Sequence, residues 1–294
     1  MRLWMGEVVV CPVGRRAEAL GLVLGREVEA GEEWEDLGLM VVLGAGGRMD
    51  GVVMYQRLAG CGGVVWAPWV RRGWGRRELG GRLVRAAVGE LRAGGVRVVQ
   101  ALVGGGVGMG GDLERGGLPY VTDLLTLSRS TEEELEVGPG VPELRWRGYE
   151  EVGEERFGEV LEATYEGSQD MPELVGVRGV GEMRAGQEAI GRFEADLWLV
   201  GEVEGEPGAA GVLVLADGEE RGCMEVVYLG LTVGARGRGL GRRVVAEAVR
   251  RSRGRRPRLE LGVDERNGVA LRLYRRVGFR EVGRRSVYLR VFGG

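Results

Sequence analysis

The sequence contains no histidine and no lysine, so its 41 basic residues are all arginines. Without histidine there is no His general base, no Ser-His-Asp triad and no His-ligated metal. Without lysine there is no Schiff-base nucleophile and no phosphate-binding loop of the GxxxxGK[ST] type. Any catalysis must therefore use Glu, Asp, Tyr, Ser, Cys and backbone amides.

Long apolar runs and clustered cysteines are also missing. No segment approaches the roughly 18 apolar residues of a membrane span, and the N-terminal apolar stretch is short and contains Glu7, unlike a signal peptide. Cys11, Cys61 and Cys223 are far apart, which indicates a reducing compartment without a disulfide framework. With 294 residues, of which 44% are hydrophobic and 29% charged, we expect a cytoplasmic protein of two globular domains with no membrane partner.

The most informative stretch is LGLTVGARGRGLGRRVVAE, residues 229–247. It begins as an apolar strand, turns through glycine and arginine, and continues as a helix with Val244, Val245 and Val249 on one face. Such a turn leaves backbone N–H groups open at a positive helix N-terminus, which suits an anion. On spacing alone a dinucleotide-binding unit stays open, because Glu260 and Asp264 lie about 20 residues on, although no second glycine-rich unit follows.

The motif Arg236-x-x-Gly239-x-Gly241 resembles the pyrophosphate loop of the GCN5-related N-acetyltransferases. Leu259–Val263, Asn267, Ala270, Leu273-Tyr274 and Gly278-Phe279 follow in that family's order. The resemblance implies an α/β (α+β) fold with a mixed, mostly antiparallel, splayed sheet flanked by helices. It also implies acetyl-CoA as the cofactor.

The two halves of the chain have the same predicted element order, which indicates an internal repeat. We predict an N-terminal domain over 1–130, a linker over 131–142 and a C-terminal domain over 143–294. The first half reads as strands at 8–10, 39–43, 52–55, 64–66, 96–102 and 124–127, with helices at 16–24 and 78–91. The second half reads as strands at 143–147, 197–200 and 209–215 before the motif, a helix at 150–164, and a loop and helix within 165–193.

The first copy looks degenerate. Arg77 stands where the glycine turn Arg72–Arg77 needs Gly or Ala, and residues 104–120 lack the later Asn and Tyr. The Arg77 side chain could block a phosphate or add a contact to it. A degenerate copy before an active one resembles the two-domain arrangement of the mycothiol synthases. In the linker, the acidic run Glu132–Glu134 is read as a solvated helical turn or tether.

Charge is unevenly divided in the second copy. Residues 143–225 hold 21 acidic residues and 7 arginines, and residues 226–294 hold 5 and 18, so the balance changes from −14 to +13. An acidic side could attract a cationic amine and a basic side a polyanionic cofactor, or the division could be ordinary surface charge.

The resemblance also implies roles for individual residues. Glu225 would be the general base and Tyr274 the general acid for the departing thiolate. Backbone amides of Leu231 and Val233 would meet the pantetheine arm and the carbonyl oxygen, those of the glycine turn would hold the pyrophosphate, and Asn267 would contact the cofactor or cap its helix. The full set expected to bind cofactor is Leu231, Thr232, Val233, Arg236, Gly237, Arg238, Gly239, Leu240, Gly241, Arg242, Asn267 and Ala270.

The turn-rich segment 165–174 is expected to bind the acceptor substrate. Glu166, Asp170 and Glu173 suit an amine, and Arg178 suits a carboxylate; Ser168 and Asp170 could also simply cap the turn. We therefore predict an acetyl-CoA-dependent N-acetyltransferase that acts on a primary amine, with a small molecule as partner, in a monomer or homodimer.

Two other readings remain. One is a non-catalytic CoA-binding or scaffold module. The other is a nucleic-acid binder using the arginine cluster at 250–258, which has no interleaved aromatics and lies at a helix end, so nucleic acid is not the favoured partner.

Overall fold

Alternate side chains of strand β2 (Gly38–Leu43) enter two separate hydrophobic cores in the computed structural model. Met40 and Val42 share a core with helix α2 (Arg76–Ala93), whereas Leu39 and Val41 share one with α1 (Arg16–Leu24). Successive strand side chains point to opposite faces, so this uninterrupted apolar run belongs to a sheet covered on both faces. The structure describes residues 6–28, 36–71, 75–104, 110–190 and 192–293.

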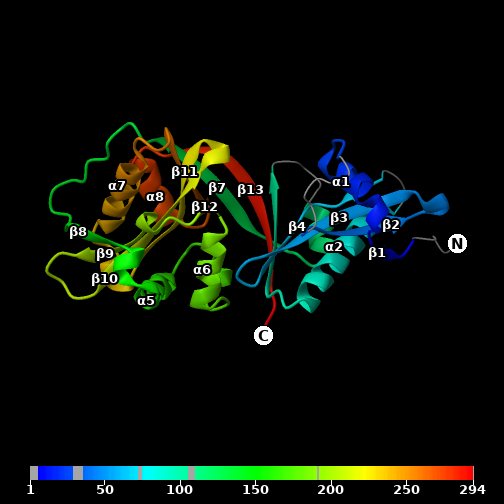
Figure 1. The fold of residues 1–294 in the computed structure, drawn as a ribbon, viewed down its shortest axis with the longest axis horizontal. Helices are drawn as coiled ribbons and strands as arrows, with labels where there is room; N and C mark the ends of the chain where they lie inside the picture. The colour runs from blue at the N-terminus through cyan, green and yellow to red at the C-terminus, as the bar shows by residue number, and fades with distance from the viewer. Residues whose placement is uncertain (1–5, 29–35, 72–74, 105–109, 191, 294) are drawn as a thin grey trace. The chain divides into compact units, whose positions relative to one another are not determined.

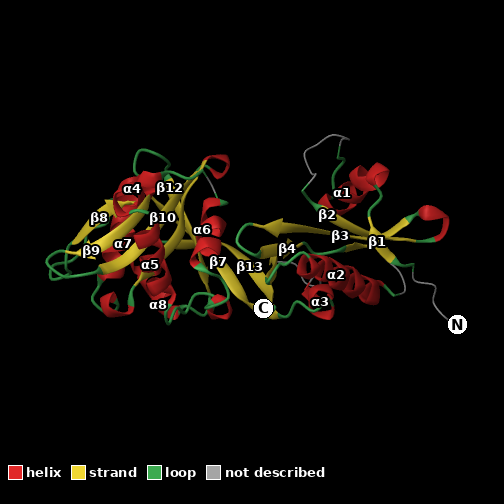
Figure 2. Cartoon of the chain, turned by 60° about the horizontal axis from the view of Figure 1, so that its bottom comes forward, coloured by secondary structure: helices red, strands yellow, loops and turns green. Residues whose placement is uncertain are grey.

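The chain divides into two units, Met1–Asp123 with Arg285–Gly294, and Leu124–Arg284 (Figure 1). Each contains a mixed, mostly antiparallel sheet with helices packed against it, which confirms the predicted fold class (Figure 2). The units differ from the predicted domains 1–130 and 143–294, because the end of the chain belongs to the first unit and residues 124–142 belong to the second.

In the first unit the strand order is β1-β2-β3-β4-β6-β13, with β5 beside β3. The β4–β6 ladder is parallel and its neighbours are antiparallel. Besides β2, the strands are β1 (Val8–Val10), β3 (Met49–Leu58), β4 (Gly62–Val65), β5 (Trp69–Val70), β6 (Val98–Gly104) and β13 (Arg280–Val291), and α3 (Gly110–Arg115) packs on α2.

In the second unit the order is β8-β9-β10-β11-β12-β7, and here the β11–β12 ladder is parallel. The strands are β7 (Tyr120–Ser130), which belongs to this unit from Leu124 on, β8 (Leu144–Gly148), β9 (Trp198–Val203), β10 (Ala209–Gly218), β11 (Cys223–Leu231) and β12 (Arg258–Asp264). The helices are α4 (Tyr149–Val152), α5 (Glu154–Tyr165), α6 (Val180–Glu188), α7 (Leu240–Ser252) and α8 (Gly268–Arg276). Short 3-10 turns occur at Pro172–Leu174, Ala195–Leu197, Glu219–Arg221 and Val233–Ala235, and in the first unit at Val13–Arg15 and Ala45–Gly47.

The two sheets have the same order of directions, but their last strands are exchanged. The strand predicted at 124–127 forms as part of β7, yet it does not close the first sheet. Leu125 and Leu127 are buried in the second core and lie opposite Val263 and Leu261 of β12. The first sheet is closed instead by residues 285–291 of β13, which pair with β6. Each closing strand has two buried apolar residues at alternate positions, Leu125 and Leu127 in β7 and Val287 and Leu289 in β13, and each is antiparallel to the strand it closes on. Local pattern alone therefore does not decide which sheet takes which strand.

The predicted linker is part of the second unit. Thr131 is fully buried, and arginines of α7 donate to the linker backbone: Arg242 to the Glu136 oxygen, and Arg243 to the Val141 and Pro142 oxygens. Residues 131–133 form bends, and residue 134 has no regular structure. The side chains of Glu132, Glu133 and Glu134 are exposed, as expected for a solvated run, but no helical turn forms there.

Most predicted elements form within a few residues of their expected ends. The helix expected over 150–164 is broken into α4 and α5 at Gly153, whose φ of 81° lies in the left-handed region. Helix α3 was not predicted. Cys11, Cys61 and Cys223 are free thiols. Among the described residues, no helix combines the length and apolar character needed to cross a membrane.

Candidate functional site

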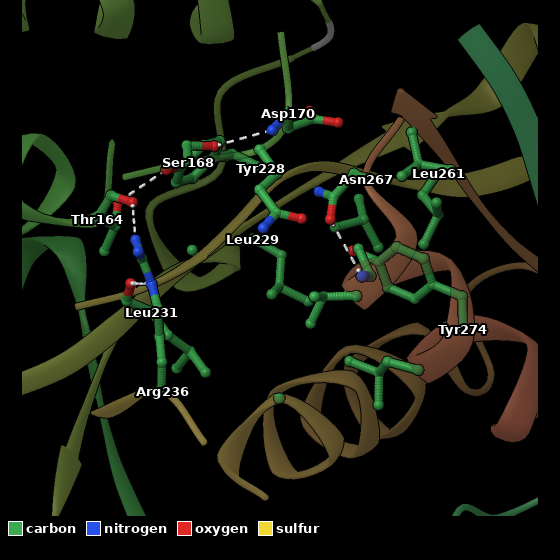
Figure 3. A pocket seen from close by; sticks show the side chains of 18 of the residues that line it. Thr164, Ser168, Asp170, Tyr228, Leu229, Leu231, Arg236, Leu261, Asn267 and Tyr274 are labelled. Carbon is green, nitrogen blue, oxygen red and sulfur yellow. Dashed lines mark hydrogen bonds between the residues drawn. The ribbon is translucent and has the colours of Figure 1, made fainter. Parts of the chain in front are cut away.

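A cavity opens where β11 and β12 separate. The two strands pair over Met224–Val226 and Leu259–Leu261, and beyond these three pairs their facing edges are not bonded to each other. A cavity of about 440 Å³ lies in this gap, bounded by both strands, the loop after α5, and the first turns of α7 and α8 (Figure 3). A bulge in the β10–β11 ladder between Val226 and Tyr228 lies just where the strands part, and bulges change the direction of a strand.

The open edge of β11 presents backbone groups to this cavity. The Thr232 N–H donates to the Ala210 oxygen at 2.9 Å, so Thr232 faces β10. Backbone groups of successive strand residues point to alternate sides, which turns those of Leu231 and Leu229 away from β10. The Leu231 oxygen accepts from Arg236 Nε at 3.0 Å, and its N–H is left directed to the cavity side.

The glycine turn has two residues in the left-handed region, Gly237 at φ 77° and Gly239 at φ 80°. Gly239 is the N-cap of α7, and a Cβ added there would meet the Val141 side chain at 3.1 Å. A Cβ on Gly241 would lie 2.9 Å from Leu273 Cδ2, so this glycine allows α7 and α8 to approach closely. The turn therefore exposes the first N–H groups of α7 with no side chain between them and the cavity, which fits a phosphate group.

The arginines around the turn are largely engaged by the protein. Besides Leu231, Arg236 donates to the oxygens of Thr164 at 3.0 Å and Gly167 at 3.3 Å. Arg238 pairs with Glu206 at 2.5 Å, and the Arg242 backbone N–H donates to the Gly239 oxygen. Of the residues predicted to bind cofactor, the cavity is lined by Leu231, Arg236, Gly237, Gly239, Leu240, Gly241, Arg242, Asn267 and Ala270, but not by Thr232, Val233 or Arg238.

Of the predicted acceptor residues, Asp170 lines the cavity, whereas Glu166, Glu173 and Arg178 do not. Glu173 instead pairs with Arg266 at 2.6 Å, and that guanidinium lowers the pKa of its carboxyl. Asp170 Oδ1 accepts from the Asp264 N–H at 2.9 Å. The residue is exposed on the cavity wall, yet the surrounding protein raises its pKa by desolvation.

Asn267 and Tyr274 lie together on the other side of the cavity (Figure 3). Asn267 Oδ1 accepts from the Ala270 N–H at 3.1 Å, so this side chain is the N-cap of α8. Tyr274 is buried against Phe279, with ring centroids 5.6 Å apart, and burial raises the pKa of its phenol. Tyr274 therefore keeps its proton at neutral pH.

Glu225 does not line the cavity. It lies in the part of β11 that is still paired on both sides, opposite Ala216 and Glu260, and its carboxylate accepts a hydrogen bond from Arg221. The strand separates from β12 only after Val226, so the predicted base lies short of the opening.

One group of cavity residues was not predicted. The Tyr228 hydroxyl lies 2.8 Å from Thr164 Oγ1, which itself donates to the Leu161 oxygen, so the Tyr228 O–H is the donor to Thr164. The Tyr228 ring stacks on Tyr165 at 4.9 Å. Burial raises the pKa of both phenols, that of Tyr165 to about 12. A tyrosine in a strand is common, so the sequence around Tyr228 carries no signal for this cavity.

The charge difference between residues 143–225 and residues 226–294 is partly neutralised by ion pairs within the second unit. Acidic residues of 143–225 pair with arginines of 226–294: Glu143 with Arg243, Glu173 with Arg266, Glu194 and Asp196 with Arg255, Glu206 with Arg238, and Asp217 with Arg256. Every arginine of the 250–258 cluster also has an acidic partner. Such pairing weakens the field that either side can project into solvent.

Residues 161–279 match the model of the acetyltransferase (GNAT) family. The N-alpha-acetyltransferase RimI of Mycobacterium tuberculosis is 45% identical over 69 residues, which are 24% of this chain and 42% of that protein. The chain thus spans less than half the length of this curated relative.

Solved structures share the fold over nearly the whole chain. A GCN5-related N-acetyltransferase from Sphaerobacter thermophilus matches with a TM-score of 0.57 and 19% identity, covering 97% of this chain and 95% of that one. A tandem GNAT protein from the clavulanic acid biosynthesis pathway matches with a TM-score of 0.55 and 14% identity, covering 98% and 99%. These likenesses support a tandem arrangement of the fold.

Proposed function

The chain belongs to the acetyltransferase (GNAT) family through residues 161–279, and from this premise we propose that its second unit is an acetyl-CoA-dependent N-acetyltransferase for a primary amine of a small molecule. One observation supports the proposal most directly. The glycine turn, the open edge of β11, Tyr274 and Asp170 of the loop after α5 all line the same cavity.

The cofactor residues are proposed from the geometry of this cavity. Bound acetyl-CoA would supply the acetyl group as an activated thioester. The N–H groups of Leu240 and Gly241, at the positive end of α7, would hold its pyrophosphate. The Leu231 N–H would bond the pantetheine arm along the open edge of β11. The backbone N–H of Arg242 already donates to the Gly239 oxygen. Arg242 would therefore line the cofactor site without donating this N–H to the pyrophosphate.

Tyr274 is proposed to donate a hydrogen bond to the departing sulfur. A thiol has a pKa near 8.5, and the pKa of the Tyr274 phenol is raised above its ordinary value of about 10. Complete proton loss from Tyr274 to the thiolate is therefore uphill. The phenol would stabilise the negative charge on sulfur by a hydrogen bond. Any proton that the phenol passes to sulfur would be replaced by the second N–H proton of the attacking amine.

The acceptor must also lose a proton before attack, because an ammonium group has no free electron pair. The family resemblance predicts Glu225 for this task. Its carboxylate bonds Arg221 outside the cavity, so its action would need a path that the described contacts do not supply.

Calorimetric titration of the purified chain with acetyl-CoA, followed by measurement of free thiol release with a panel of primary amines, tests the proposal. We expect one site per chain, lost in Gly239→Glu, and amine-dependent thiol release. Binding without release for any amine would favour a non-catalytic CoA-binding module. Absence of binding would overturn the proposal, and two sites per chain would show that the first copy also binds.

A further inference from the structure

We propose that Asp170, and not Glu225, is the residue that takes the proton from the acceptor ammonium. This inference rests on the proposed function of the second unit. It assigns a proton acceptor within the cavity, on the loop between α5 and α6, where sequence reasoning expected only a substrate contact.

Asp170 lies on the wall of the cavity that also contains Asn267 and Tyr274 (Figure 3). One carboxylate oxygen, Oδ1, accepts from the Asp264 N–H at 2.9 Å. The Asn267 Oδ1 is occupied in capping α8, so its amide group has donors left for a neighbour, and a hydrogen bond from Asn267 is one of the effects that lower the pKa of Asp170. The carboxylate is therefore oriented by donors on β12 and at the start of α8 while the residue stays exposed to the cavity.

The loop that carries Asp170 is fixed to the end of β12. The Met171 N–H donates to Asp264 Oδ2 at 3.2 Å, and Glu173 pairs with Arg266 at 2.6 Å. Asp264 itself is completely buried, and Arg266 binds its carboxylate at 2.6 Å. Asp264 thus positions Asp170 without facing a substrate. A catalytic side chain needs such support, because a displacement of about 1 Å can remove much of its contribution to the rate.

The charges around Asp170 leave it a better base than an ordinary carboxylate. Desolvation is the main influence on its pKa and raises it, and the neighbouring Asp264 carboxylate acts in the same direction. The Asp264 N–H, the Asn267 amide and the Arg266 guanidinium act against this without reversing it. The phenols of Tyr165, Tyr228 and Tyr274 also feel its charge, and all three stay neutral because their own pKa values are raised. The raised pKa narrows the gap to an amine of pKa near 10.

The protons of the transfer reaction can be balanced with two residues of this cavity, Asp170 and Tyr274. Asp170 accepts one proton from the acceptor ammonium and later releases it to solvent. The freed amine forms the C–N bond at the thioester carbonyl while the C–S bond breaks. The sulfur gains a proton by way of Tyr274, and the second N–H proton of the amine restores the phenol. The products are an amide, a thiol and one released proton.

The test compares kcat/KM between pH 6 and 10 in wild-type protein, Asp170→Asn and Glu225→Gln, with Glu162→Gln as a control on the exposed face of α5. We expect Asp170→Asn to lose about 100- to 1,000-fold at pH 7 and to regain activity as the pH approaches the pKa of the free amine. Its Kd for acetyl-CoA should stay within about twofold of wild type by calorimetry. Among accepted amines, the loss should shrink as the pKa of the amine falls.

The outcomes separate the two proposals. A wild-type protein that binds acetyl-CoA but acetylates no amine would overturn the proposed function. An active wild type with full activity in Asp170→Asn, or with the large loss in Glu225→Gln alone, would overturn only the assignment of Asp170. A loss in Asp170→Asn that is the same at every pH would also contradict it, because a merely structural defect is not repaired by supplying neutral amine.

Discussion

Desolvation acts on both Asp170 and Tyr274, and at the scale of single residues the two shifts have different consequences. The carboxyl becomes easier to protonate, which suits a group that collects a proton. The phenol becomes harder to ionise, which keeps a donor beside the reacting sulfur. Both effects have the same cause, because surrounding protein disfavours the charged form of each group.

Replacing Tyr274 tests its role as a donor. Tyr274→Phe keeps the ring that packs on Phe279, so the fold should be preserved, but it removes the hydroxyl. We expect kcat to fall by about 10- to 100-fold with little change in the KM for acetyl-CoA, since the lost hydrogen bond forms as charge develops on sulfur. Steady-state kinetics measure both constants. Tyr120→Phe, at an exposed tyrosine of the first unit, is the control; equal activities in the two variants would contradict the role of Tyr274.

Asp170 should also leave a mark on stability. Its pKa is higher in the folded chain than in the unfolded one, so the folded state holds more protons and the free energy of unfolding falls as pH rises above the unfolded pKa of about 3.9. Asp170→Asn removes this cost. We expect a higher Tm than wild type at pH 7 and a difference that shrinks as pH approaches 4, measured by calorimetry. A Tm lower than wild type at pH 7 would show that ionised Asp170 stabilises the fold.

At the scale of elements, the glycine turn joins β11 to α7 through left-handed backbone conformations that residues other than glycine rarely adopt. Gly237 has φ 77° and open space where a Cβ would lie, so Gly237→Ala probes conformation without a clash. We expect a loss of about 1–2 kcal/mol in the free energy of unfolding, the usual cost of the left-handed region. Gly234→Ala is the matched control, since Gly234 has an ordinary φ and equally open surroundings. Urea denaturation compares them, and equal losses would argue against backbone strain as the cause.

The elements of the site differ in how far sequence could predict them. The glycine turn is a local feature, because its glycines and the start of α7 lie within a few residues of each other, and its glycines line the cavity. Tyr228 was missed and Glu225 lies outside the cavity, because both positions depend on where β11 bulges and leaves β12. The hydrogen bond from the Asp264 N–H to Asp170 Oδ1 joins residues 94 positions apart, so no local sequence pattern predicts it.

Arg236 shows the same limit within the motif itself. Its place in the motif marked it for the cofactor, and it lines the cavity. Its guanidinium, however, also joins the end of β11 to the end of α5 through the oxygens of Leu231, Thr164 and Gly167. A single planar group with several donors can bridge these carbonyls in a way that lysine cannot. The glycine turn and the loop that carries Asp170 therefore share one positioning residue.

At the scale of the whole molecule, the repeat was readable but the exchange of closing strands was not. Strand and helix patterns recur at similar spacing in both halves, so element order follows from the sequence. The partners of β7 and β13 do not, since either strand offers alternating apolar residues to either sheet. For the same reason the predicted domain ends separate residues that the two cores require.

Truncation tests this dependence of the first unit on the end of the chain. A protein ending at Arg284 lacks Val287 and Leu289, which are buried in the first unit beside β6. Burial of two such side chains contributes roughly 3–6 kcal/mol, a large part of the stability of an ordinary domain. We expect an earlier calorimetric transition for the first unit, while the second unit keeps β7, its core and its Kd for acetyl-CoA. Removal of only Gly293 and Gly294 is the control, because it leaves β13 intact. If the shorter protein melts like the full chain, β13 is not the strand that completes the first core; if acetyl-CoA binding disappears with it, the cavity depends on more than the second unit.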